Sequence, residues 1–171
     1  MSDLLSTFPD FSAKVSSVLN KNVREYGKKF LFDNCDDTCW NSDQGSPQFI
    51  SLHFKDQPLK QISQVEIQFQ GGFVGTHCHF LINEETKQDF FPEDSNKLQR
   101  FSLVPVQQEN ITSLKIVFGG STDFFGRITI YHLKLLSENG EEFETCNSWA
   151  RKMWQNCSCR TVFGQQICGR L

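Results

Sequence analysis

The sequence has no excess of basic residues, no long apolar run and no leader-like start. Its formal net charge is −3, whereas nucleic-acid-binding proteins usually carry a basic face, so we expect no direct contact with nucleic acid. No segment approaches the ~20 apolar residues of a membrane helix. The stretch MSDLLSTFPDFSAKV lacks the basic and apolar regions of a secretory signal. We therefore expect a protein of the nucleus or cytoplasm that is neither secreted nor bound to a membrane.

Motifs for catalysis are also missing. No serine lies in a G-x-S-x-G turn, and the four histidines have no evident nucleophile beside them. The glycine-rich segments QGGF (70–73) and FGG (118–120) lack the spacing of a phosphate-binding loop. They instead predict turns or bulges, where the backbone must bend. We expect that the chain is not an enzyme and carries no cofactor, calcium being the one candidate considered below.

The cysteine count gives no sign of a disulfide framework. Seven is an odd number, and reduced thiols are the usual state in the nucleus and cytoplasm. Four of the seven, Cys146, Cys157, Cys159 and Cys168, lie near the C-terminus. A Cys₄ zinc site, free thiols and oxidised pairs are the alternatives there. Zinc is disfavoured because Cys-x-Cys is not the usual C-x₂₋₄-C spacing of structural zinc.

Phenylalanine dominates the aromatic residues and favours strands. The chain has 17 Phe against two Tyr and three Trp, and aromatic side chains suit half-buried sheet faces. In SQVEIQFQ, Val65, Ile67 and Phe69 alternate with polar residues, which places them on one face of a strand. The same pattern predicts strands at 48–54, 63–70, 78–82, 88–91, 100–104, 113–118 and 127–135.

The last of these strands changes phase along its length. Ile128 and Ile130 occupy one face, whereas Leu133 and Leu135 occupy the other, and this predicts a β-bulge near Tyr131-His132. Turn residues such as Gly71-Gly72 separate the predicted strands. Many short strands at such spacing are typical of an antiparallel sandwich or barrel, so the fold class is predicted as all-β.

Three segments follow from this pattern. Residues 1–13 are expected to form a loose or briefly helical lead-in, 14–137 the β-sandwich and 138–171 a Cys- and Trp-rich C-terminal extension. Within that extension, NSWARKMWQN fits a short amphipathic helix, because Trp149 and Met153 are four residues apart and Trp154 follows one step round.

The placed strands carry a family resemblance. The segment FLFDNCDDTCWNSDQGSPQFISLHF resembles a discoidin-type signature, in which an Asp turn and Thr-x-Trp-x-Ser precede a strand. Blocks in order along about 14–137 look more closely like the nuclear receptor-associated protein family, whose known member is a partner and repressor of a testicular orphan nuclear receptor. The resemblance implies a discoidin-like, galactose-binding-like jelly-roll β-sandwich. The blocks are VSSVLN (15–20), GKKFLFD (27–33), TCWNSDQG (38–45), IQFQGGF (67–73), FPEDSNKLQ (91–99) and TDFFGRITIYHL (122–133).

Calcium is the metal that this resemblance suggests. Many discoidin-like relatives bind Ca²⁺ at the acidic turn, where Asp33, Asp36 and Thr38 are the candidate ligands, and Ca²⁺ takes oxygen ligands. Cys35 is a poor neighbour for a hard cation, and the closing strand carries His132 where calcium-binding relatives often carry Glu. The alternative is that Asp33 and Thr38 hydrogen-bond the turn while Trp40 packs in the core.

Binding to another protein is the function that we predict. The candidate contact residues are Phe124, Phe125 and Arg127 in the DFFGR loop, and Trp149, Met153 and Trp154 in the extension. In a strand, neighbouring Phe124 and Phe125 would face opposite ways, so we expect one in the core and one at the loop rim. The resemblance implies a nuclear-receptor co-regulator. The alternatives are a structural subunit of a ciliary or cytoskeletal assembly, because an intraflagellar transport subunit has a similar fold, and a module that binds a glycan or calcium.

Overall fold

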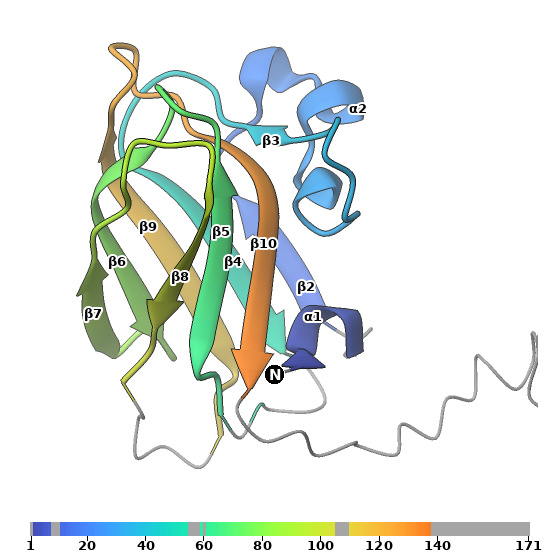
Figure 1. The fold of residues 1–171 in the computed structure, drawn as a ribbon, viewed down its shortest axis with the longest axis vertical. Helices are drawn as coiled ribbons and strands as arrows, with labels where there is room; N and C mark the ends of the chain where they lie inside the picture. The colour runs from blue at the N-terminus through green and yellow to red at the C-terminus, as the bar shows by residue number, and fades with distance from the viewer. Residues whose placement is uncertain (1, 8–10, 55–58, 60, 105–109, 138–171) are drawn as a thin grey trace, which may run out of the picture. The chain divides into compact units, whose positions relative to one another are not determined.

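Two antiparallel sheets face each other across an apolar core (Figure 1). The computed structural model describes residues 2–7, 11–54, 59, 61–104 and 110–137. The strands are β1 Ser2–Asp3, β2 Phe11–Val15, β3 Trp40–Asn41, β4 Gln48–Phe54, β5 Gln64–Phe69, β6 Gly75–Ile82, β7 Thr86–Phe90, β8 Leu98–Ser102, β9 Ser113–Ser121 and β10 Thr129–Ser137. The short helices are α1 Leu4–Thr7, η1 Leu19–Lys21, α2 Val23–Tyr26 and η2 Lys28–Leu31.

Strand pairing gives a jelly-roll sandwich. Sheet A has the order β1-β10-β5-β8, with β3 also paired to β10, and sheet B has the order β2-β4-β9-β6-β7. All of these strands pair in the antiparallel sense. The all-β prediction is confirmed, and each of the seven predicted strands overlaps an observed one. The ends differ: β6 begins before the predicted residue 78, and β9 continues past 118.

The predicted β-bulge lies in β10. The pairing of β10 with β5 shifts register between Ile130 and His132. Both Ile130 and Leu133 belong to the same core cluster although they are three residues apart, whereas a regular two-residue alternation would place them on opposite faces of the strand. The bulge therefore lets both halves of β10 contribute side chains to the same core.

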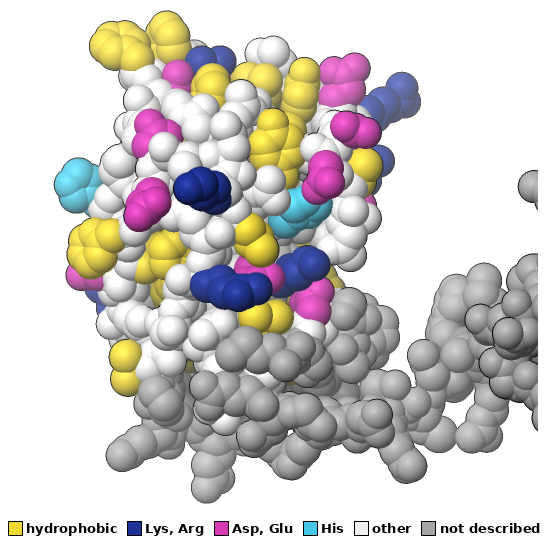
Figure 2. Space-filling model, in the orientation of Figure 1, with side chains coloured by type: hydrophobic (Ala, Val, Ile, Leu, Met, Phe, Trp, Pro, Cys, Tyr) yellow, Lys and Arg dark blue, Asp and Glu magenta, His cyan; other side chains and the backbone are white. Residues whose placement is uncertain are grey.

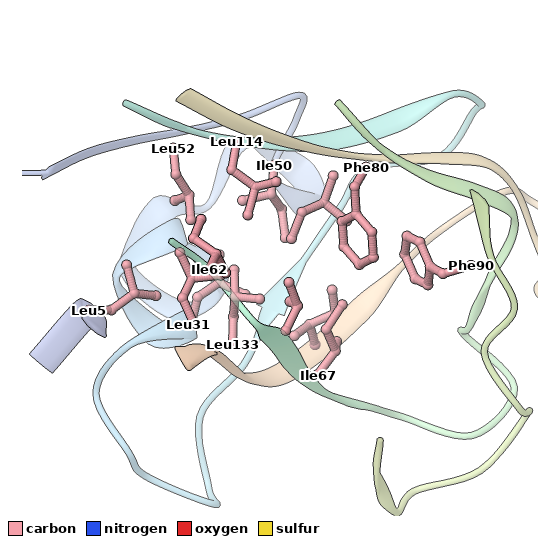
Figure 3. Close-up of a cluster of buried hydrophobic side chains, with 14 of the residues drawn as sticks. Leu5, Leu31, Ile50, Leu52, Ile62, Ile67, Phe80, Phe90, Leu114 and Leu133 are labelled. Carbon is pink, nitrogen blue, oxygen red and sulfur yellow. The ribbon is translucent and has the colours of Figure 1, made fainter. Parts of the chain in front are cut away.

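Alternate side chains from the two sheets meet in that core. Figure 3 shows Ile67 and Leu133 of sheet A pointing toward Ile50, Leu114 and Phe80 of sheet B. Aromatic rings strengthen the contact: those of Phe69 and Phe118 meet edge to face at 5.9 Å. Phe80 and Phe90 stack at 4.1 Å. Fully burying side chains of this size contributes ~1.5–3 kcal/mol each.

The N-terminal residues take part in the sandwich. Residues of β1 pair with Leu136 and Ser137 of β10, and Leu4 and Leu5 of α1 are buried in the core. The expected lead-in of residues 1–13 thus contains β1, α1 and the first part of β2, and the expected boundary at residue 14 falls inside β2. The expected extension, 138–171, lies outside the described residues.

One side chain joins the two sheets at their open edges. Gln88 of β7 donates a hydrogen bond from Nε2 to the carbonyl oxygen of Ser102, at 2.8 Å. Its Oε1 accepts one from the backbone N–H of Val104, also at 2.8 Å. Because β7 ends sheet B and β8 ends sheet A, Gln88 closes the gap between the two edge strands.

Across the described part of the chain, none of the helices has the length and hydropathy needed to span a membrane.

Gly75 allows β6 to approach β9, and a substitution at this position tests the packing. A Cβ on Gly75 would lie 2.4 Å from Cδ1 of Phe118 and 2.8 Å from Sγ of Cys78. We expect Gly75→Ala to lower the free energy of unfolding by ~1–3 kcal/mol, as overpacking in a core does, measured by chemical denaturation.

The matched control is Gly71→Ala, where the nearest atom to a new Cβ is 3.5 Å away on Asn96. That variant should unfold close to the wild type. Equal stability of the Gly75 and Gly71 variants would show that the packing around Gly75 yields without cost.

Candidate functional site

The acidic loop, residues 33–38, hydrogen-bonds to itself and to β10. Asp33 accepts hydrogen bonds from the Thr38 hydroxyl at 2.7 Å and from the Cys35 N–H at 3.1 Å. Asp36 pairs with the far strand instead: its Oδ1 is 2.7 Å from Nε2 of His132. The three predicted calcium ligands are therefore not gathered at one point, since Asp36 is directed toward His132.

This arrangement matches the alternative interpretation, in which Asp33 and Thr38 hydrogen-bond the turn while Trp40 packs in the core. Trp40, next to the acidic loop, is fully buried, and its Nε1–H donates to the carbonyl oxygen of Ser17 at 3.0 Å. No cluster of three or more His, Cys, Asp or Glu side chains suited to a metal ion occurs within the described ranges. Calcium binding by Asp33, Asp36 and Thr38 stays a prediction.

A shallow depression of about 200 Å³ lies beside the acidic loop. Its floor is the outer face of sheet A, with His132 and Lys134 from β10 and Gln68 from β5, and Asn34 and Asp36 form its wall. Sequence reasoning missed this depression, because Asp36 and His132 are 96 residues apart and only the fold brings them together.

The β9–β10 connection, residues 121–128, is called here the aromatic loop. Phe124 is 94% exposed and Phe125 56% exposed, and their rings meet edge to face at 5.3 Å. The expectation that one of them lies in the core is wrong. Both residues belong to a turn between strands rather than to a strand, so the two-residue alternation that would bury one of them does not apply.

Arg127 and Asp123 brace the aromatic loop. The guanidinium donates to both carboxylate oxygens of Asp123, at 2.9 and 3.0 Å, and the Arg127 backbone N–H adds a third bond at 3.1 Å. These hydrogen bonds hold the pKa of Asp123 below its usual range and raise the pKa of Arg127. The guanidinium also lies over the rings of Phe73, at 5.0 Å, and Phe125, at 5.5 Å, which favours a cation–π contact.

Backbone contacts fix the same loop against its neighbour. The N–H of Gly45 donates to the carbonyl oxygen of Phe125 at 2.8 Å. Gly126 has a φ of 81°, a left-handed conformation that suits glycine. A Cβ there would lie 3.0 Å from the carbonyl of Gly45. Phe124, Phe125 and Arg127 are the contact candidates predicted from the sequence, and the structure brings them together. Asp123 and Phe73 complete the group. The other candidates, Trp149, Met153 and Trp154, lie outside the described residues.

The thiols of the described residues differ in their surroundings. Cys35, Cys39 and Cys78 are free. Cys78 is 1% exposed, and burial raises the pKa of its thiol to about 12. Burial also raises the pKa of the Cys39 thiol. Since the thiolate is the reactive form, a raised pKa makes a thiol slow to react.

Alkylation should therefore distinguish these thiols. With iodoacetamide at about pH 8.5, the ordinary pKa of a free thiol, we expect modification of Cys35 in the folded protein and none of Cys78, as read by peptide mass spectrometry. Unfolding in denaturant should make Cys78 as reactive as Cys35, which serves as the control. Rapid modification of Cys78 in the folded protein would contradict its placement in the core.

The ion pair in the aromatic loop predicts a pH dependence. Because the folded-state pKa of Asp123 is depressed, the pair contributes stability above the unfolded pKa of about 3.9 and loses it as the pH falls through the folded pKa. We expect Asp123→Asn to lower the melting temperature near neutral pH, and the gap to the wild type to narrow in acid. Asp89→Asn, which removes an exposed carboxylate paired with Lys87, is the control. A gap that stays constant with pH would contradict the role given to the ion pair.

Solved structures with the same fold are carbohydrate-binding and F5/8 type C domains. An F5/8 type C domain from Bacteroides fragilis aligns with a TM-score of 0.58 at 13% identity, covering 74% of this chain and 90% of the other. A family 32 carbohydrate-binding module from C. perfringens in complex with galactose gives 0.56 at 17% identity, covering 73% and 92%. A chitosan-binding module from Paenibacillus sp. gives 0.60 at 10% identity, covering 80% and 100%. At these identities the likeness shows the fold alone, and it confirms the discoidin-like sandwich.

Sequence relatives identify the family more narrowly. No protein-family model matches the chain. Mouse nuclear receptor 2C2-associated protein is 47% identical over 135 residues, which cover 76% of this chain and 93% of the mouse protein. The human protein of that name is 46% identical, with 76% and 94% covered, and the zebrafish protein, Danio rerio, is 47% identical, with 74% and 90% covered. The chain therefore belongs to the nuclear receptor 2C2-associated protein family.

Proposed function

We propose that this chain is a non-enzymatic binding module that associates with a nuclear receptor through its aromatic loop. The observation that carries the proposal is the exposure of Phe124, 94% open to solvent on a loop that is braced at both ends. The names of relatives aligned over 90% or more of their length support the kind of partner.

The aromatic loop has the properties of an interaction hot spot. Aromatic side chains with few rotatable bonds supply a large contact area at low entropic cost. The bracing by Asp123 and Gly45 keeps Phe124 and Phe125 in place before binding, so less order has to be imposed when the partner arrives. Figure 2 shows hydrophobic side chains at the top of the view, where the aromatic loop lies in Figure 1.

The proposed mode of action is occupation of receptor surface. The protein would act in the nucleus as a co-regulator of the repressor type, by covering a surface that other partners of the receptor need. Such an effect requires a stable contact and no chemical step.

Removal of both rings should weaken the association. We expect Phe124→Ala/Phe125→Ala to weaken binding to purified nuclear receptor 2C2 by at least about tenfold, the size of effect typical of an interface hot spot. The melting temperature should stay unchanged, because both side chains are exposed. Titration calorimetry of the full chain into the receptor measures the affinity.

Val104→Ala is the matched control, since Val104 is 66% exposed and lies outside the aromatic loop and the loops that contact it. Its affinity should equal that of the wild type. If the double variant binds the receptor as tightly as the wild type, the aromatic loop is not the contact. Addition of galactose, the ligand of a solved module with this fold, should leave receptor binding unchanged.

We also propose the C-terminal extension as a second contact element. Trp149, Met153 and Trp154 would lie along one side of a helix if that segment is helical, an arrangement that fits a partner's groove. The same titration with Trp149→Ala/Trp154→Ala separates the contribution of the extension from that of the aromatic loop.

A further inference from the structure

A series of contacts links four loops at the end of the sandwich that carries Phe124 and Phe125. The aromatic loop is hydrogen-bonded to 42–47 through Gly45, and Arg127 packs on Phe73 in the loop 70–74. That third loop is in turn held by 91–97, because Asp94 accepts a hydrogen bond from the N–H of Gly72 at 2.7 Å. These four segments are called the loop end, and the contacts just described link them to one another.

The loop end is acidic. Its carboxylates are Asp43, Glu93, Asp94 and Asp123, and its cations are Lys97 and Arg127, so four negative charges stand against two positive ones, a net charge of −2. Arg127 and Asp123 neutralise each other through their paired hydrogen bonds. The net negative charge therefore comes from the segments that border the aromatic side chains.

Basic residues of the N-terminal half lie elsewhere. Lys21, Arg24, Lys28 and Lys29 belong to the segment from η1 to η2 and are exposed. In Figure 1 this blue segment and the orange aromatic loop lie on opposite sides of the top of the molecule. The charge of the loop end is thus separate from the basic segment.

We propose that the loop end recognises a protein segment whose apolar side chains are bordered by Lys or Arg. This inference rests on the proposed function and names the chemistry of the partner. The apolar side chains cover Phe124 and Phe125, while the basic ones face Glu93 and Asp94. Because Asp123 already satisfies Arg127, covering that guanidinium leaves no unpaired charge, which would otherwise be costly.

Charge complementarity argues against a nucleic acid but not against a second copy of this chain. A nucleic acid would bring phosphates against carboxylates. A second copy of this chain could present its basic segment, Lys21 to Lys29, to the loop end. That arrangement would appear as a dimer in light scattering.

Selection from a random peptide library displayed on phage tests the proposal. The full chain is the target, and the Phe124→Ala/Phe125→Ala variant removes phage that bind elsewhere. We expect the peptides that survive to combine apolar residues with a net positive charge. The most enriched peptide is then synthesised, and its affinity is measured by fluorescence anisotropy at low and physiological salt.

Charge reversal supplies the decisive comparison. Glu93→Lys should lower the affinity for that peptide by about three- to tenfold, the scale of one to two charges at the rim of an interface. Higher salt should lower the affinity of the wild-type protein for the peptide. Gln99 holds the backbone of Glu93 at both its N–H and its carbonyl, so the loop keeps its shape. Glu84→Lys, the same change in the β6–β7 turn where the residue is also exposed, should have no effect.

Four results would overturn the proposal: selected peptides without a basic excess, no selected peptide at all, an affinity indifferent to Glu93→Lys, or a dimer that Glu93→Lys dissociates. The proposed function is tested by a different result, the loss of receptor binding in the Phe124→Ala/Phe125→Ala variant. If receptor binding needs Phe124 and Phe125 but is unchanged by Glu93→Lys, the proposed function stands and the charge inference fails.

Discussion

Burial of alternate side chains between the two sheets is the constraint on which the rest of this structure depends. β5 and β9 supply strictly alternating apolar residues, such as Val65, Ile67 and Phe69, that reach across to the opposite sheet. β10 could not do the same along its whole length without the register shift after Ile130. Because β10 pairs with β5, β1 and β3, it holds the N-terminal residues, the Trp40 turn and the end of the aromatic loop in one frame.

The two acidic turns that the sequence singles out have different roles in the structure. In the acidic loop, Asp33 accepts a hydrogen bond from Thr38, and Asp36 pairs with His132. In the aromatic loop, Asp123 accepts its hydrogen bonds from Arg127, and the neighbouring rings of Phe124 and Phe125 are exposed. A carboxylate stabilises the turn in both cases, but only the second turn presents apolar surface to a partner.

Local patterns predicted the strands and much of the core, and distant contacts set the limits of that prediction. Alternation has a two-residue period that is readable from a few residues, so the strands around Ile67 and Ile116 and the bulge in β10 were accessible. The burial of Leu4 and Leu5 was not, since it depends on pairing with the far end of the chain. The exposure of both Phe124 and Phe125 was missed, because the two-residue alternation of a strand was applied to residues that form a turn.

Gln88 has a consequence for how this molecule can meet others. Its amide fills hydrogen-bonding positions at the end of β8, the place where an added strand from another chain would begin to zip onto sheet A. Because those positions are already satisfied, Gln88 hinders the pairing of another chain at this end of β8, much as natural sheets protect their edges from growth by strand addition.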